Sequence, residues 1–96
     1  MNKFLTVVSY PENEDGEFIT KKKDYEIFSV KDVVRICFLY DSNGYTLIID
    51  FADDQYEYPI SDSISDYELH AIITQLTDFL KDTQTTTWLD LTTYQR

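Results

Sequence analysis

The sequence predicts an α+β fold: an antiparallel β-sheet of four to five strands, arranged as a β-meander, with one amphipathic helix packed on one face. Three observations predict it. Two turn signals separate alternating apolar segments, a capping signal precedes a helical apolar pattern, and 43% of the 96 residues are hydrophobic. We expect residues 1–96 to form a single acidic domain, because this length fits one domain rather than two.

The first 30 residues predict one strand and leave a second ambiguous. Lys3–Tyr10 carries apolar side chains on both faces, which is typical of a strand in the centre of a sheet. Pro11–Glu17 has the composition of a loop. Within the ambiguous stretch Phe18–Val30 we expect a strand near Tyr25–Ser29. The basic run Lys21–Lys23 is interpreted as a solvated edge that discourages strand pairing.

The middle of the chain predicts a hairpin. Asn43-Gly44 lies between the alternating segments Val33–Asp41 and Tyr45–Phe51, and this dipeptide favours a two-residue type I′ turn. Centring the turn there places apolar residues opposite one another on one face of the sheet. The predicted pairs are Tyr40 with Leu47, Phe38 with Ile49, and Ile36 with Phe51.

A second turn at Asp53-Asp54 extends the hairpin to a three-stranded meander. Its register again places apolar side chains on the same face, which supports both turns. Pro59 predicts that the third strand lies at an edge. The predicted pairs are Phe51 with Tyr56, Ile49 with Tyr58, and Leu47 with Ile60.

Ser65–Asp82 is the predicted helix. Ser65 followed by Glu68 fits a capping box, in which each side chain binds the other residue's backbone N–H. The tail segment Thr86–Leu91 favours a strand, and a short helix is the alternative. Apolar residues at helical spacing predict one buried stripe, made of Leu69, Ile72, Ile73, Leu76, Phe79 and Leu80.

Charge is the strongest functional signal. The chain has 18 acidic and 8 basic residues, a net charge of −10, and residues 41–96 account for −9 of it. Such a chain repels phosphates and anionic lipids, so we expect it to bind neither nucleic acid nor a membrane directly. The predicted register also places Asp50 opposite Glu57, and like charges that face each other on a sheet cost stability.

Few residues point to catalysis. The only histidine, His70, lies on the predicted helix, and the only cysteine, Cys37, faces away from the predicted core in register with Asp50. No metal-ligand spacing, complete calcium loop or glycine-rich phosphate loop is present. We therefore expect a non-enzymatic protein without cofactor or metal. One cysteine and no signal-peptide pattern favour the cytoplasm.

Two interpretations of the acidity remain: a solvated surface that maintains solubility, or a recognition face for a basic protein, such as a nuclease or another nucleic-acid-binding effector. On the second interpretation, carboxylates occupy places where phosphates would lie, and an exposed tyrosine adds contact area. The predicted partner-binding residues are Asp50, Asp53, Asp54, Glu57, Asp62, Asp66, Tyr67 and Glu68.

In composition and size the chain resembles two groups of small inhibitors. One group is phage-encoded blockers of CRISPR or restriction effectors, some of which are nucleic-acid mimics and which act in the host cytoplasm. The other is bacterial immunity proteins that neutralise nuclease toxins. A third hypothesis is an assembly module that associates with itself through sheet edges and tyrosines, so we expect a monomer or a homodimer.

Overall fold

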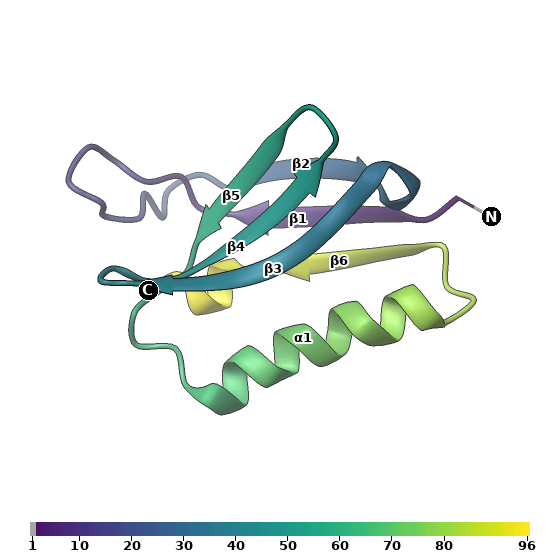
Figure 1. Ribbon diagram of the computed structural model, residues 1–96. Coiled ribbons are helices and arrows are strands. Elements are labelled where there is room, and N and C mark those ends of the chain that lie inside the picture. The colour runs from purple at the N-terminus through teal and green to yellow at the C-terminus, as the bar shows by residue number, and fades with distance from the viewer. Residues whose placement is uncertain (1) are drawn as a thin grey trace.

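A computed structural model describes residues 2–96 and shows an α+β protein (Figure 1). Its elements follow the predicted order along the chain, with short 3-10 turns at Val30–Asp32 and Thr92–Tyr94. The strands and the helix are β1 (Phe4–Ser9), β2 (Asp24–Ser29), β3 (Val33–Asp41), β4 (Gly44–Phe51), β5 (Gln55–Pro59), α1 (Asp66–Lys81) and β6 (Thr86–Asp90).

The strands form two three-stranded sheets, so the prediction of one antiparallel sheet of four to five strands is wrong. One sheet has the order β2-β1-β6 and the other is the meander β3-β4-β5. β1 is central, as predicted, but β6 pairs with it in parallel, with Thr86 beside Phe4. The helix α1 runs back along the molecule, and this returns the chain to the end where β1 begins (Figure 1).

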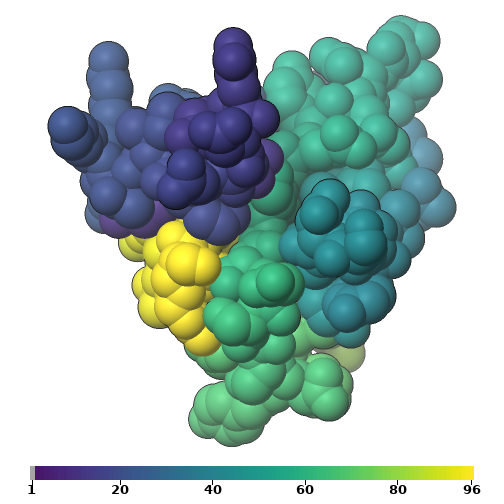
Figure 2. Space-filling model, turned by 90° about the vertical axis from the view of Figure 1, so that its left-hand side faces the viewer, coloured from purple at the N-terminus to yellow at the C-terminus, as the bar shows by residue number. Residues whose placement is uncertain are grey.

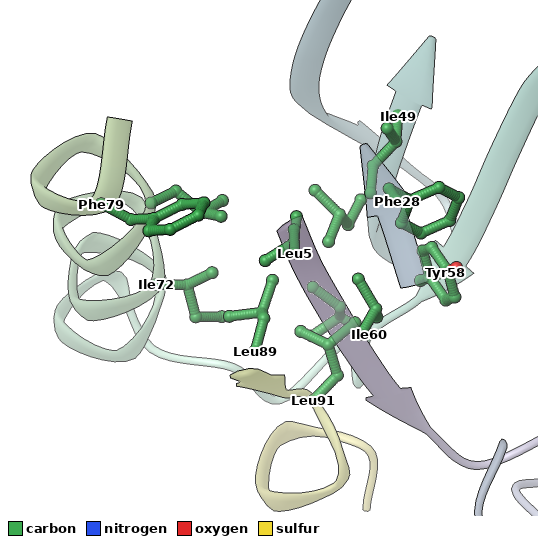
Figure 3. Packing of buried hydrophobic residues seen from close by; sticks show 12 residues of the cluster. Leu5, Phe28, Ile49, Tyr58, Ile60, Ile72, Phe79, Leu89 and Leu91 are labelled. Atoms are coloured by element: carbon green, nitrogen blue, oxygen red, sulfur yellow. The ribbon is translucent and has the colours of Figure 1, made fainter. Parts of the chain in front are cut away.

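The core lies between the inner faces of the two sheets and α1 (Figure 3). Alternation along each strand places one set of side chains inside, and the helix adds its apolar stripe. Leu69, Ile72, Leu76 and Phe79 are buried as predicted, whereas Ile73 and Leu80 lie at the margin of the stripe and are exposed. The remaining core residues are Leu5, Val7, Phe28, Leu47, Ile49, Tyr58, Ile60, Leu89 and Leu91.

Both meander registers are shifted by two residues from the predicted ones. Ser42 and Asn43 form the first turn, so that Asp41 faces Gly44 and Phe38 faces Leu47. In the second hairpin Leu47 faces Tyr58. A shift of two residues keeps every side chain on its predicted face, because side chains alternate with a period of two.

The shift corrects two details of the predicted surface. Tyr40 was expected in the core, but it lies at the end of β3 and is 71% exposed, stacking edge to face on Tyr45. Asp50 does not face Glu57, because it faces Gln55 on β5 and Arg35 on β3. Cys37, on the outer face as predicted, faces Ile48 rather than Asp50.

Both ends of α1 are capped. Ser65 Oγ accepts a hydrogen bond from the N–H of Glu68 (3.1 Å), and Glu68 Oε1 accepts one from the N–H of Ser65 (3.1 Å), which confirms the capping box. At the other end the Lys3 ammonium group donates to the carbonyls of Phe79 and Asp82, where a positive charge suits the helix dipole. None of the helical segments in residues 2–96 has the length and apolar composition needed to cross a membrane.

Candidate functional site

A hollow of about 830 Å³ is lined by six carboxylates that come from three separate segments. Figure 2 faces this end of the molecule: the purple-to-blue N-terminal segment and the teal segment near residue 41 stand on either side of the green and yellow segments. We call it the acidic hollow. Its carboxylates are those of Glu12, Glu14, Asp15, Glu17, Asp41 and Asp62.

Four of these carboxylates lie on an ordered loop that Asn13 organises. Asn13 Oδ1 accepts hydrogen bonds from the N–H groups of Asp15 (2.9 Å) and Glu17 (3.0 Å), and its backbone binds Gly16 and Glu17. Gly16 has a positive φ of 80°, which a residue without a Cβ adopts at little cost. The loop backbone therefore has a defined conformation, and its acidic residues form one wall of the hollow.

A close backbone contact joins the two segments that carry the other two carboxylates, Asp41 and Asp62. Gly44 follows the β3–β4 turn with φ of 106°, and a Cβ there would lie 2.7 Å from the Cα of Asp62. Only glycine lets the two segments approach this closely. Asp41 is fixed at the same turn, because its Oδ1 accepts a hydrogen bond from the N–H of Asn43 (2.8 Å).

Buried Gln95 ties the two sheets together at the base of the hollow. Its Oε1 accepts a hydrogen bond from the N–H of Tyr10 (2.6 Å), just before the acidic loop. Its Nε2 donates to the carbonyl of Pro59 (2.8 Å), at the end of β5. Because Gln95 is only 2% exposed, these hydrogen bonds are shielded from water and fix the loop against the meander.

A cleft of about 560 Å³ adjoins the hollow and adds three carboxylates: Asp24, Glu26 and Glu57. Glu12 and Asp41 line both cavities, so the two form one continuous surface. Tyr58 Oη donates a hydrogen bond to Glu26 Oε1 (2.7 Å) across the gap between β5 and β2. Burial, and then the Glu26 hydrogen bond, raise the pKa of Tyr58 well above its ordinary value.

We call the hollow and the cleft together the acidic surface. Few basic side chains neutralise its carboxylates. Within residues 2–96 two ion pairs form: Arg35 with Asp50 (2.8 Å) and Arg96 with Glu68 (2.9 Å). Arg96 is the one basic residue that lines the hollow or the cleft, and its charge is engaged by Glu68. The carboxylates of the acidic hollow thus have no cationic group from residues 2–96 within 4.0 Å.

The predicted partner-binding residues do not form one surface. Asp53 and Asp54 are exposed at the β4–β5 turn, at the opposite end of β4 from Gly44 and Asp62. Eight residues of extended strand separate the two ends by about 25 Å. Asp50 lies near that turn, where Gln55 and Arg35 bind its carboxylate and lower its pKa.

The other predicted residues divide between the acidic surface and the helix start. Asp62 lines the hollow and Glu57 lines the cleft. Asp66 and Tyr67 are exposed in the first turn of α1, and Tyr67 is 85% exposed. Glu68 binds Arg96 and completes the helix cap at Ser65, and these two contacts lower its pKa to about 2.

Most of the acidic surface was not predicted from the sequence, because along the N-terminal part of the chain its acidic residues are nearly offset by basic ones. Residues 1–40 carry seven acidic and six basic residues, so this part of the chain looks balanced. The segment 11–17 alone has four acids and no base, and this run was the available signal. The missed residues are Glu12, Glu14, Asp15, Glu17, Asp24, Glu26 and Asp41.

A separate exposed surface lies on the outer face of the β2-β1-β6 sheet. Trp88 is 62% exposed and packs edge to face on exposed Tyr25 across β1, with ring centroids 5.9 Å apart. Phe4 and Ile27 are also exposed on these strands. This face is aromatic and apolar, unlike the acidic hollow.

His70 is exposed on α1, and Cys37 is half-buried on the outer face of β3. Among residues 2–96 no group of three or more His, Cys, Asp or Glu side chains is arranged to hold a metal ion. Comparison of the chain with protein-family models, curated proteins and solved structures gives no match.

Proposed function

We propose that this protein is a small non-enzymatic inhibitor that binds a basic nucleic-acid-binding surface of a nuclease or related effector and blocks it. The observation that carries the proposal is the continuous surface of the acidic hollow and the adjoining cleft. It gathers nine carboxylates from both sheets around a single arginine that is already paired. On this proposal the protein works in the cytoplasm of the cell that contains its target.

The shape of this surface favours a protein partner with projecting cationic side chains. Long lysine and arginine side chains reach into a hollow, and guanidinium groups bind carboxylates through paired hydrogen bonds. Nucleic-acid-binding grooves are lined by these residues. The ordered loop and the Gln95 hydrogen bonds hold the carboxylates in place before binding, which lowers the ordering cost of association.

The proposal is tested with purified effectors of the expected classes: a CRISPR nuclease, a restriction enzyme and a bacterial nuclease toxin. Each is incubated with the inhibitor, and cleavage of a labelled DNA duplex is measured together with displacement of that duplex. We expect inhibition of at least one effector, weakening between about 50 mM and 200 mM salt because charge pairs carry the binding. Inhibition of the toxin alone would assign the protein to the immunity group.

Two charge-reversed variants locate the binding surface. Glu14→Lys/Asp15→Lys/Glu17→Lys alters the wall of the hollow, and Asp53→Lys/Asp54→Lys/Asp66→Lys changes the net charge equally at predicted residues outside it. We expect the first triple variant to lose inhibition by about tenfold or more, a loss of about 1.4 kcal/mol. The second should retain most of the inhibition.

Three results would overturn the proposal: no inhibition of any effector class, an affinity that does not change with salt, or loss of inhibition only in the second triple variant. Circular dichroism and melting temperature show whether each variant is folded. The comparison is balanced because both triple variants change the net charge from −10 to −4.

A further inference from the structure

β3 is an edge strand whose outer side is open. The N–H of Phe51 donates to the carbonyl of Asp54, and the N–H of Ile60 donates to the carbonyl of Tyr45. The odd-numbered residues of β4 therefore direct their backbone groups toward β5, and the even-numbered ones toward β3. In the observed register, residues 35, 37, 39 and 41 of β3 lie opposite the even-numbered residues of β4, so their backbone groups bond to β4. The backbone N–H and C=O groups of Ile36, Phe38 and Tyr40 therefore point away from β4, toward the open edge of the sheet.

The other three sheet edges are protected, and β3 is not. β6 is short, and Gln75 of α1 donates to its Trp88 carbonyl (2.8 Å). β5 carries Pro59, and β2 carries acidic side chains. From Ile36 to Tyr40 the β3 edge has no charge, proline or glycine, although proteins commonly use these to prevent edge pairing.

The sequence of β3 is complementary to itself in the antiparallel direction. Arg35 and Asp41 lie at equal distances on either side of Phe38, on the same outer face of the sheet. If two copies of β3 pair about a two-fold axis at Phe38, each Arg35 faces the other copy's Asp41. A shift of the axis by one residue in either direction breaks both charge pairs.

This register also matches the backbone and the exposed side chains. Phe38 faces Phe38 of the second copy, and Ile36 faces Tyr40, so the outward N–H and C=O groups meet in hydrogen-bonded pairs. Leu39, which is 53% exposed, faces Cys37 on the outer side. Arg35 can take part because its side chain remains 63% exposed while it binds Asp50.

We propose that the protein forms a two-fold symmetric homodimer through antiparallel pairing of its β3 strands, which joins the two meanders into one six-stranded sheet. Each partner supplies the same edge, as symmetric dimers require. The buried strip is narrow, so the dimer is a weak one that forms at micromolar concentrations or above. The dimer places Asp41, which also lines the acidic hollow, beside Arg35 of the second copy, whereas the acidic loop 11–17 is not part of β3. The inference rests on the β3 edge and does not depend on the proposed function.

Sedimentation equilibrium of the purified protein at about 0.15 M salt tests the dimer across protein concentrations from about 10 µM to 1 mM. We expect a monomer–dimer equilibrium. Tyr40→Pro removes an outward N–H without breaking a hydrogen bond to β4, and it should abolish the dimer. If Tyr40→Pro does not fold, Leu39→Lys places a charge on the exposed edge and serves the same purpose.

The charge pairs between Arg35 and Asp41 are tested with the variant Asp41→Asn, and Asp53→Asn is its control. The asparagine side-chain oxygen can still accept the hydrogen bond from the N–H of Asn43, and both variants change the net charge equally. Asp41→Asn should weaken association about threefold to tenfold, because it removes two charge pairs per dimer. Asp53→Asn should not weaken it.

The register is tested by oxidation of a mixture of the native protein and a Cys37→Ser/Leu39→Cys variant. Residues 37 and 39 of opposite copies form a non-hydrogen-bonded pair with Cα atoms about 4.5 Å apart, which suits a disulfide. The mixed disulfide should therefore form faster than either homodimeric one. A monomer at all concentrations, or a dimer that Tyr40→Pro and Leu39→Lys leave unchanged, would overturn the inference.

Discussion

At the scale of single residues, Tyr58 joins the two sheets by one hydrogen bond. Its ring is buried in the core, and its hydroxyl donates to Glu26 on β2, in the other sheet. Tyr58→Phe keeps the ring and leaves this carboxylate without its donor. We expect the free energy of unfolding to fall by about 1–2 kcal/mol, measured by urea denaturation.

Tyr56→Phe is the matched control, because Tyr56 lies on the same strand and its hydroxyl makes no hydrogen bond within residues 2–96. Equal destabilisation by both substitutions would contradict the role of the Glu26 contact. The raised pKa of Tyr58 also has a pH consequence. The folded state favours the protonated phenol, so this contribution is complete below the unfolded pKa of about 10 and is lost as pH rises above it.

Glu68 couples the helix start to the end of the described chain. Arg96 first, and then the N–H of Ser65, lower its pKa from 4.5 to about 2. A carboxyl whose pKa is lower in the folded state stabilises the fold above the unfolded pKa and loses this effect as pH falls toward the folded value. We expect Glu68→Gln to flatten the dependence of melting temperature on pH between about 4.5 and 2.

Glutamine can still bind the Ser65 backbone, so this variant isolates the ionic contribution of Arg96. Asp66→Asn is the control, since Asp66 lies in the same helical turn and makes neither contact. If Asp66→Asn flattens the pH dependence as much as Glu68→Gln, the general effect of acids at a helix start explains the data better than the Arg96 contact.

At the scale of elements, the contact between the β3–β4 turn and Asp62 depends on Gly44. A Cβ at this position would collide with backbone atoms of Asp62 in addition to the cost of a positive φ. Gly44→Ala should therefore lower the free energy of unfolding by about 3 kcal/mol or more. Gly16→Ala, with φ of 80° and no atom within 4 Å of a Cβ, should cost only about 1–2 kcal/mol.

Denaturant titration of the two glycine variants separates steric contact from backbone strain, since strain is common to both. Equal losses would show that the Asp62 contact contributes little. A larger loss for Gly44→Ala would show that close packing at this turn holds one side of the acidic hollow together.

The elements also show which features the sequence predicts. The start of α1 is a local feature, because the capping box needs only Ser65 and Glu68, and its prediction is confirmed. The other end is not local, because its carbonyls bind Lys3. The meander faces were predicted correctly while its registers were wrong, because apolar alternation cannot detect a shift of two residues. The division into two sheets depends on long-range pairing of β1 with β6, which leaves no local sequence pattern.

The acidic surface shows the same limit in the candidate site. Asp62 and Glu57 were predicted and lie on this surface, but the carboxylates beside them come from β2 and from the loop 11–17. Proximity of these segments depends on Gln95, whose hydrogen bonds join residues far apart in the chain. Sequence composition indicated an acidic face, and tertiary structure determined which acids form it.

At the scale of the whole molecule, a net charge of −10 should make folding stability depend on salt. The molecule extends 41 Å along its longest axis, and two ion pairs form within residues 2–96. Repulsion between carboxylates therefore exceeds attraction across its surface. Raising sodium chloride from about 0.01 M to 0.15 M shortens the Debye length from about 30 Å to about 8 Å and screens this repulsion.

We expect the melting temperature to rise over this salt range, by about 4–8 °C for each kcal/mol of repulsion that is screened. Neutralising the wall of the hollow with Glu14→Gln/Asp15→Asn/Glu17→Gln should raise the melting temperature at low salt and reduce its response to added salt. A melting temperature that falls with salt would mean that the Arg35 and Arg96 ion pairs outweigh the repulsion. A large response that the triple variant leaves unchanged would place the repulsion outside the wall of the hollow. The part of the salt response that the triple variant removes thus measures, without any partner, the repulsion at the hollow that a basic partner would relieve on binding.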